Sequence, residues 1–142
     1  MRRFAKARKF SSSRINWVGA PDVKKRVNAL VKNLEIDWIK TSRIFAYRST
    51  ASKTRAYARI WGLSSLWQRT LGVAPAYIVE VLSEHYDDLS DTEKDKVLLH
   101  ELTHIPKNFS GALLPHIRRG KRNFHRKVDS LIDLYFQKMN ER

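Results

Sequence analysis

Two histidines and a glutamate within five residues have the types and spacing to bind a metal ion and to move a proton. They are His100, Glu101 and His104, in the pattern H-E-x-x-H. Residues four apart on a helix project from one face, so both imidazoles can reach one metal ion, and neutral imidazole suits zinc. Glu101 then lies beside the metal, where its carboxylate can accept a proton from an activated water. The pattern predicts one Zn2+ with Glu101 as catalytic base.

The residues before the motif predict the helix that this spacing requires. Ser90 and Glu93 have the S-x-x-E form of a capping box, which satisfies backbone N–H groups at a helix start. Acidic residues cluster in the first turn, where the helix dipole favours them. Pro106 follows the motif and cannot continue the helix. The motif is therefore expected in the last turns of a short capped helix.

Zinc needs a third protein ligand, and a catalytic zinc keeps a fourth position for water. The chain has no cysteine, and the position six residues after His104 is Ser110, which excludes the tightest three-histidine spacing. The only glutamate after the motif is Glu141, near the chain end. Two histidines remain: His116 in the following loop, and His125 near the start of the last helix. We favour His116, because a loop can fold back onto the metal without opening the core, and keep His125 as the alternative.

Hydrophobic periodicity predicts the elements that must position these residues. They are a helix over residues 22–34, strands over 43–48, 55–61 and 75–82, the motif helix, a loop, and a helix over 122–139. Residues 66–71 are expected to form a weaker strand or a turn. The fold class is therefore α+β, with an N-terminal helix, a small sheet of about three strands, the motif helix and a C-terminal helix.

Residues 1–20 differ from the rest of the chain in being basic, rich in serine and without an apolar periodicity. We expect them to form a flexible basic tail, followed by a single domain over residues 21–142. No apolar run is long enough to span a bilayer, and none follows the basic N-terminus as in a secretory signal. The sequence thus predicts a cytoplasmic protein with no membrane partner.

The positive charge is confined to one half of the chain. The net charge is +14; residues 1–72 hold 17 Lys or Arg and 3 Asp or Glu, whereas residues 73–142 hold 11 of each. All four tryptophans also lie in the first half. Basic residues interleaved with aromatic ones are typical of nucleic-acid-binding proteins. We expect contact with DNA or RNA, the alternative being a solubilising surface over buried tryptophans.

The expected contact with DNA or RNA can be assigned to specific residues. The tail supplies cations, and strand alternation over residues 55–61 places two arginines and two aromatic rings on one face, as a stacking platform would require. A half-exposed sheet face with extended arginines explains the alternation equally well. The expected nucleic-acid-binding residues are Arg2, Arg3, Lys6, Arg8, Lys9, Arg55, Tyr57, Arg59 and Trp61.

The motif and the residues after it resemble a known family. The run Leu98-Leu99-His100-Glu101-Leu102-Thr103-His104-Ile105-Pro106, then Phe109-Ser110-Gly111 and Leu114-Pro115-His116, is similar to metallopeptidases of archaea, bacteria and phages, which are akin to small SprT-like zincins. The resemblance covers about residues 40–138 and is sharpest over 97–116. It implies a minimal zincin-like domain with His100, His104 and His116 as zinc ligands and Glu101 as base.

Two functions are compatible with the sequence. The first is an enzyme, a zinc-dependent metallopeptidase that hydrolyses protein or peptide substrates, with SprT-like analogy extending to substrates associated with nucleic acid. The second is a non-catalytic protein that binds nucleic acid or the ribosome and keeps a structural zinc on the same scaffold. The charge asymmetry favours the second function and the complete H-E-x-x-H motif favours the first.

Overall fold

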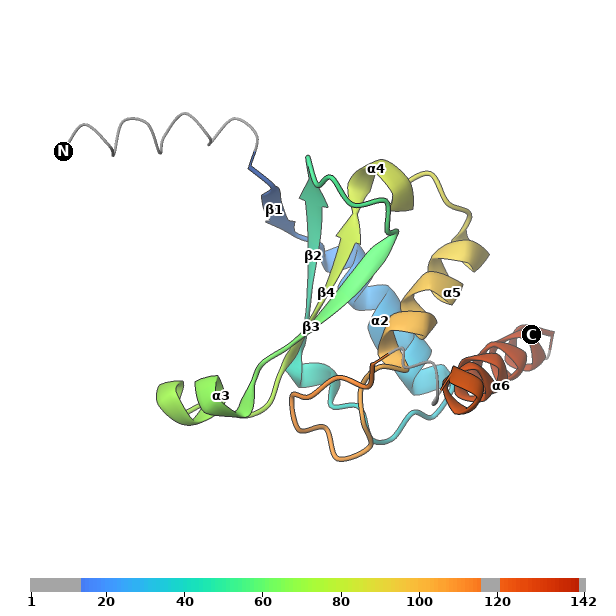
Figure 1. The fold of residues 1–142 in the computed structure, drawn as a ribbon. Helices are drawn as coiled ribbons and strands as arrows, with labels where there is room; N and C mark the ends of the chain where they lie inside the picture. Colours follow the sequence, from blue (N-terminus) through green and yellow to red (C-terminus); the bar gives the residue numbers. More distant parts are fainter. Residues whose placement is uncertain (1–13, 116–120, 141–142) are drawn as a thin grey trace.

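A four-stranded sheet forms the centre of the molecule (Figure 1). The computed structural model describes residues 14–115 and 121–140, with side chains for 14–115 and 130–140. The strands are β1 (Asn16–Gly19), β2 (Ile44–Thr50), β3 (Ala58–Gly62) and β4 (Tyr77–Leu82). Their order is β1-β2-β4-β3; β2 and β4 are parallel, and the other two pairs are antiparallel. This mixed architecture confirms the predicted α+β class.

The longer helices lie on one side of this sheet (Figure 1). The helices of the described residues are α2 (Pro21–Asn33), α3 (Ser65–Leu71), α4 (Ser83–Tyr86), α5 (Asp91–Leu102) and α6 (Lys121–Asn140). A 3-10 turn, Thr41–Arg43, precedes β2. The helices α2 and α5 pack against the sheet and against each other, and α6 packs on α5. Within the described part of the chain, no helix is both long enough and apolar enough to cross a membrane.

The core lies between the sheet and the helices α2 and α5. The helix α2 begins with Pro21 in its first turn, where the missing N–H costs no hydrogen bond, and turns one apolar stripe inward. The strand β4 contributes alternate residues from the opposite side. The buried side chains from these elements include Val23, Val27, Leu30, Val31, Tyr77, Val79, Val81, Leu98, Leu99 and Leu102. This packing fixes the position of the motif helix α5 relative to the sheet.

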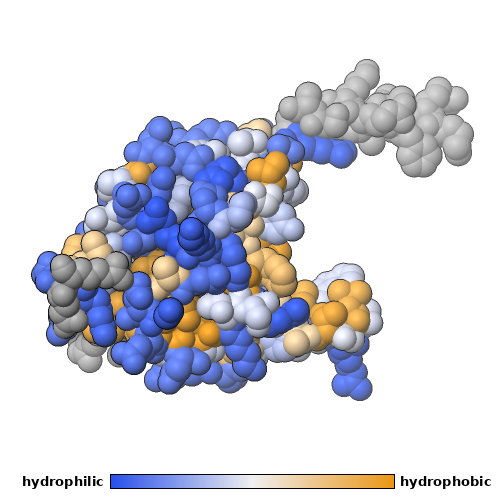
Figure 2. Space-filling model, turned by 180° about the vertical axis from the view of Figure 1, so that it is seen from behind, coloured by the Kyte–Doolittle hydropathy of each residue, from blue (hydrophilic) through white to orange (hydrophobic). Residues whose placement is uncertain are grey.

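The other face of the sheet exposes large side chains. Trp17, Phe45, Tyr47, Trp61 and Ile78 come from all four strands and are between 38% and 54% exposed. Hydrophobic residues are also exposed on and near α3, which protrudes from the body (Figure 1). In Figure 2 hydrophobic surface forms part of this protrusion, among white and blue atoms, and more of it lies between the protrusion and the body of the molecule. We call the sheet surface of Trp17, Phe45, Tyr47, Trp61 and Ile78 the open face.

Two local assignments from the sequence need correction. Part of the expected tail, Asn16–Gly19, is β1 and adds a fourth strand to the sheet. All four of its residues are exposed, so it has no hydrophobic alternation, and pairing with β2 defines it. Residues 66–71, expected as a strand or turn, lie in the helix α3. The Ser64 hydroxyl accepts from Trp67 N–H at its start, and Gly72 ends it in the left-handed conformation.

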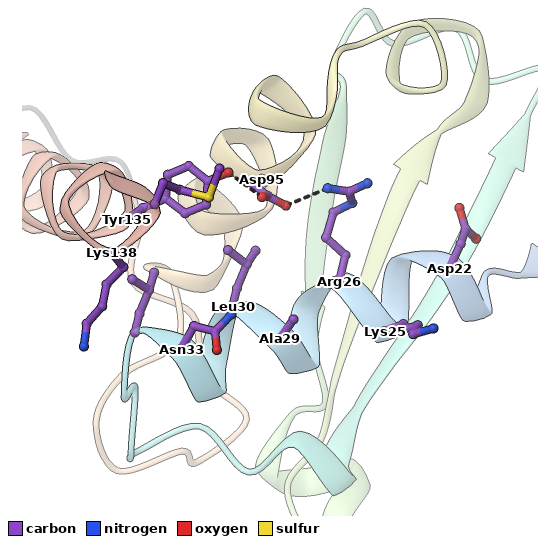
Figure 3. A pocket seen from close by; sticks show the side chains of 11 residues that line it. Asp22, Lys25, Arg26, Ala29, Leu30, Asn33, Asp95, Tyr135 and Lys138 are labelled. Carbon is purple, nitrogen blue, oxygen red and sulfur yellow. Dashed lines mark hydrogen bonds and ion pairs between the residues drawn. The ribbon is translucent and has the colours of Figure 1, made fainter. Parts of the chain in front are cut away.

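One partly buried carboxylate joins the three long helices (Figure 3). Asp95 of α5 accepts a hydrogen bond of 2.9 Å from the Arg26 guanidinium of α2 and one of 2.7 Å from the Tyr135 hydroxyl of α6. The Asp95 side chain is only 14% exposed. Arg26 also binds Asp91, at the start of α5, but the Asp91 side chain is 88% exposed. The strength of the junction therefore depends on Asp95.

We predict that Asp95→Ala lowers the free energy of unfolding by about 1–3 kcal/mol, because a partly buried guanidinium and a hydroxyl lose their acceptor. Asp91→Ala is the matched control, since it removes the exposed partner of the same arginine and should cost less than about 1 kcal/mol. Urea unfolding followed by circular dichroism measures both. Equal losses for the two variants would contradict the assignment of Asp95 as the junction.

Candidate metal and catalytic site

The H-E-x-x-H motif lies at the C-terminal end of α5. The capping box is present at the other end: Glu93 N–H donates to the Ser90 hydroxyl, and Ser90 N–H donates to the Glu93 carboxylate. The last turn then tightens, and His104 N–H donates to the Glu101 carbonyl at 3.1 Å. The imidazoles of His100 and His104 remain on one side, with ring centroids 5.4 Å apart. The predicted helix and the predicted pairing of the two histidines are therefore both present.

A backbone carbonyl orients the second histidine. His104 Nδ1 lies 2.5 Å from the Leu114 carbonyl oxygen, so Nδ1 carries the proton of a neutral ring and donates it. The lone pair is then on Nε2, the nitrogen that metal-binding histidines use when Nδ1 is held in this way. Leu114 N–H in turn donates to the His104 carbonyl at 2.7 Å. These reciprocal bonds join the loop after the motif to the end of α5.

Several further contacts hold this loop against the sheet. The Tyr77 hydroxyl accepts from Gly111 N–H at 2.8 Å and donates to the Ala112 carbonyl at 2.7 Å. The Gln68 amide donates to the Ser110 carbonyl at 2.8 Å. A Cβ at Gly62 would lie 2.1 Å from the Gly111 carbonyl oxygen, so only glycine allows β3 and the loop to approach this closely. The sequence analysis did not identify Tyr77 or Gln68 as residues that hold this loop; Tyr77 is a polar residue at the start of the apolar strand β4, and no local signal marks Gln68.

The third motif residue, Glu101, lines a hollow beside the sheet edge. The hollow has a volume of about 370 Å3 and is bounded by α5, α6 and the approach to β3. Its lining residues are Ala56, Tyr57, Ala58, Lys96, Val97, His100, Glu101 and Ile132. Burial raises the pKa of the Glu101 carboxyl to about 7. A carboxyl in this range can both accept and release a proton near neutral pH.

The two histidines fit zinc by their spacing. Imidazoles on a tetrahedral zinc, with bonds of about 2.0–2.1 Å, have ring centres about 5 Å apart, which agrees with the separation of His100 and His104. Among the described side chains, no third His, Asp or Glu completes a group that could hold a metal ion. His116 and the side chain of His125 lie outside the described residues. The last described residue of the anchored loop is Pro115, immediately before His116 in the sequence.

Comparison with known families gives an independent result. The family model described as "Putative phage metallopeptidase" matches residues 15–131, which include the motif, the loop and the whole sheet. The chain belongs to this phage metallopeptidase family. No curated protein and no solved structure matches it. The family indicates a metal-dependent peptidase and confirms the resemblance drawn from residues 97–116, while the likeness to SprT-like zincins stays a prediction.

The residues expected to bind nucleic acid are divided in the structure. Arg59 and Trp61 lie on the open face, as alternation in β3 predicts. Arg55 and Tyr57 precede β3; Arg55 is exposed, whereas Tyr57 lines the hollow beside His100 and lies against His85. The four residues that were expected to form one platform therefore lie in two separate groups. The tail residues Arg2, Arg3, Lys6, Arg8 and Lys9 lie outside the described residues.

A buried glutamate at the centre of the open face was not expected. Glu80 of β4 is 1% exposed and accepts from both indole N–H groups, Trp61 at 2.7 Å and Trp17 at 3.3 Å. The Arg59 guanidinium donates to its two oxygens at 3.0 and 3.2 Å. Burial alone would raise the pKa of Glu80, but the hydrogen bonds from Arg59 and Trp61 and the positive charge of Arg59 outweigh it and lower that pKa to about 2. The sequence feature that could have revealed Glu80 is that it is a single acid in the apolar run of β4.

We predict that this carboxylate makes stability depend on acid pH. The pKa of Glu80 is about 2 when folded and 4.5 for an unperturbed glutamate side chain, so its contribution is complete above pH 4.5 and is lost as the pH falls towards 2. The loss amounts to at most about 3 kcal/mol. Unfolding free energies of wild type and Glu80→Gln, measured between pH 6 and about pH 2, should diverge at high pH and converge at low pH. A constant difference would contradict the assignment.

Proposed function

We propose that this protein is a zinc-dependent peptidase with His100 and His104 as two of the zinc ligands. The observation that supports this most directly is the pairing of the imidazoles, 5.4 Å apart, with His104 Nδ1 bonded to the Leu114 carbonyl. That carbonyl fixes the ring and its tautomer before any metal binds. We assign His116 as the third ligand, because Leu114, two residues before it in the sequence, is bonded to His104. A zinc ion bound there supplies Lewis-acid activation of a water and of the scissile carbonyl.

The chain's own contribution to hydrolysis falls mainly to Glu101. Its carboxylate lines the same hollow as His100, within a water-poor environment that raises its pKa. In the proposed reaction Glu101 accepts the proton of the attacking water and then delivers it to the nitrogen of the leaving amine. Glu101 therefore takes up and releases the same proton, and its carboxylate is deprotonated again at the end of each turnover. This role requires the carboxylate and is lost with an amide.

In the proposed reaction the substrate binds along the edge of the sheet. The strand β3 is the edge strand next to the hollow, and Tyr57 and Ala58 at its start line that hollow. An extended peptide can pair with the exposed backbone of an edge strand and so place one of its peptide bonds beside Glu101. The basic charge of the chain is compatible with substrates that are proteins associated with nucleic acid.

We predict that the purified protein carries about one zinc ion per chain, and that His100→Ala and His104→Ala each lose it. The matched control is His85→Ala, which removes a histidine near the hollow that lies outside the motif. Atomic emission on dialysed protein measures the metal, and circular dichroism confirms folding. Wild-type protein that folds but holds no zinc after zinc supplementation would contradict the proposal, as would zinc loss in His85→Ala alone.

In the same preparations, Glu101→Gln should keep its zinc and lose hydrolysis of quenched-fluorescent casein by at least about 100-fold, since only the base is removed. Glu93→Gln in the same helix is the control, because glutamine also serves in a capping box. A wild-type protein with zinc but without any peptidase activity would favour the second function, a non-catalytic protein with a structural zinc.

We predict that His116→Ala weakens zinc affinity strongly, whereas His125→Ala leaves affinity near the wild-type value and affects stability instead. The reason is that the loop before His116 is already bonded to His104. Competition with a chromophoric chelator measures zinc affinity, and thermal unfolding measures stability. The reverse pattern would show that His125 is the third ligand.

A further inference from the structure

The open face has an ordered arrangement of aromatic rings. Strand register places Phe45 and Trp61 on either side of Ile78, and Tyr47 and Arg59 on either side of Glu80. Trp17 extends the surface onto β1 and lines, with Tyr47, Trp61, Ile78 and Glu80, a hollow of about 490 Å3. In the described part of the chain no helix packs over these rings, which remain 39–54% exposed. This is a large apolar surface for a protein with a separate core.

Two of these rings are held in position before any partner binds. The indole N–H groups of Trp17 and Trp61 both donate to Glu80, so the ring edges point inward and are fixed. Arg59 neutralises the carboxylate, which leaves the floor of the hollow without an unpaired charge. Fixed rings lose little conformational entropy when a planar group stacks on them. The open face is therefore preorganised for flat ligands rather than for a second charged group.

Cations surround the rings. The Arg43 guanidinium lies 5.7 Å from the Phe45 ring centroid, and the Arg59 guanidinium lies 5.4 Å from that of Trp61. The first thirteen residues, which precede β1 in the sequence, hold five Lys or Arg and no acid. Stacking rings beside basic residues match the chemistry of single-stranded nucleic acid.

We propose that the open face binds single-stranded nucleic acid, with bases stacked on Phe45, Tyr47 and Trp61, in a chain whose net charge of +14 attracts the phosphates. A second copy of the chain is a poorer occupant, because two chains that each carry a net charge of +14 repel one another. The site is distinct from the hollow of Glu101, and neither the proposal nor its test depends on peptidase activity. It replaces the expected platform of residues 55–61 with rings from β2 and β3.

Fluorescence anisotropy with full-length protein tests the proposal, using labelled oligothymidylate, oligouridylate and a duplex of the same length. We expect both single strands to bind more tightly than the duplex. Phe45→Ala and Tyr47→Ala should each weaken single-strand binding by about fivefold to 100-fold, the range for one lost base stack. Neither ring bonds to Glu80 in the structure, so the fold should persist. Replacing the five cations of residues 1–13 by Gln should reduce the salt slope by up to about 3.5.

The matched control is Phe136→Ala. Phe136 lies on α6 and is similarly exposed, with Lys96 4.9 Å above its ring as Arg43 lies above Phe45. Its removal should leave affinity unchanged. Absence of binding at low salt would overturn the proposal, as would equal affinities for wild type, Phe45→Ala and Tyr47→Ala. Sedimentation that shows a dimer lost in Phe45→Ala, without nucleic-acid binding, would instead identify the open face as a self-association surface and also overturn it.

Discussion

The reciprocal bonds between His104 and Leu114 constrain the rest of the candidate site. The Leu114 N–H satisfies a carbonyl beyond the end of α5, and the Leu114 carbonyl holds the His104 ring in one tautomer. The loop can make this pair only because Tyr77, Gln68 and the Gly62–Gly111 approach hold it against the sheet. A metal ligand is therefore oriented by tertiary structure, and damage to these supports should affect metal binding without touching a ligand.

Local signals in the sequence predicted most of the helical framework. The capping box at Ser90 and the apolar stripe after Pro21 are short-range features, and both α5 and α2 form where they indicate. The side-by-side placement of His100 and His104 was also predicted from helical spacing, although α5 ends at Leu102 and a turn carries His104. What these residues could not reveal is the carbonyl that orients His104, because it belongs to a loop whose path depends on contacts with β3, β4 and α3.

The sheet was harder to predict because its details are non-local. The exposed strand β1 has no periodicity of its own, and its pairing partner β2 is about thirty residues away. The role of Glu80 is also non-local, because the groups that donate hydrogen bonds to its carboxylate come from β1 and β3. In α3, by contrast, the signals of a serine at the start and a glycine at the end were local, and a short apolar run concealed them. The two faces of the sheet thus acquire different roles, one packing the core beside the motif and one left exposed.

The most direct test of the account is the coordination shell of the bound metal. Zinc K-edge X-ray absorption on the zinc-loaded full-length protein should show about three imidazole ligands at about 2.0–2.1 Å and one oxygen ligand. The same measurement on His104→Ala should show loss of imidazole scattering. A shell made only of oxygen ligands, or one that is unchanged in His104→Ala, would contradict the assignment of the H-E-x-x-H histidines as a zinc site.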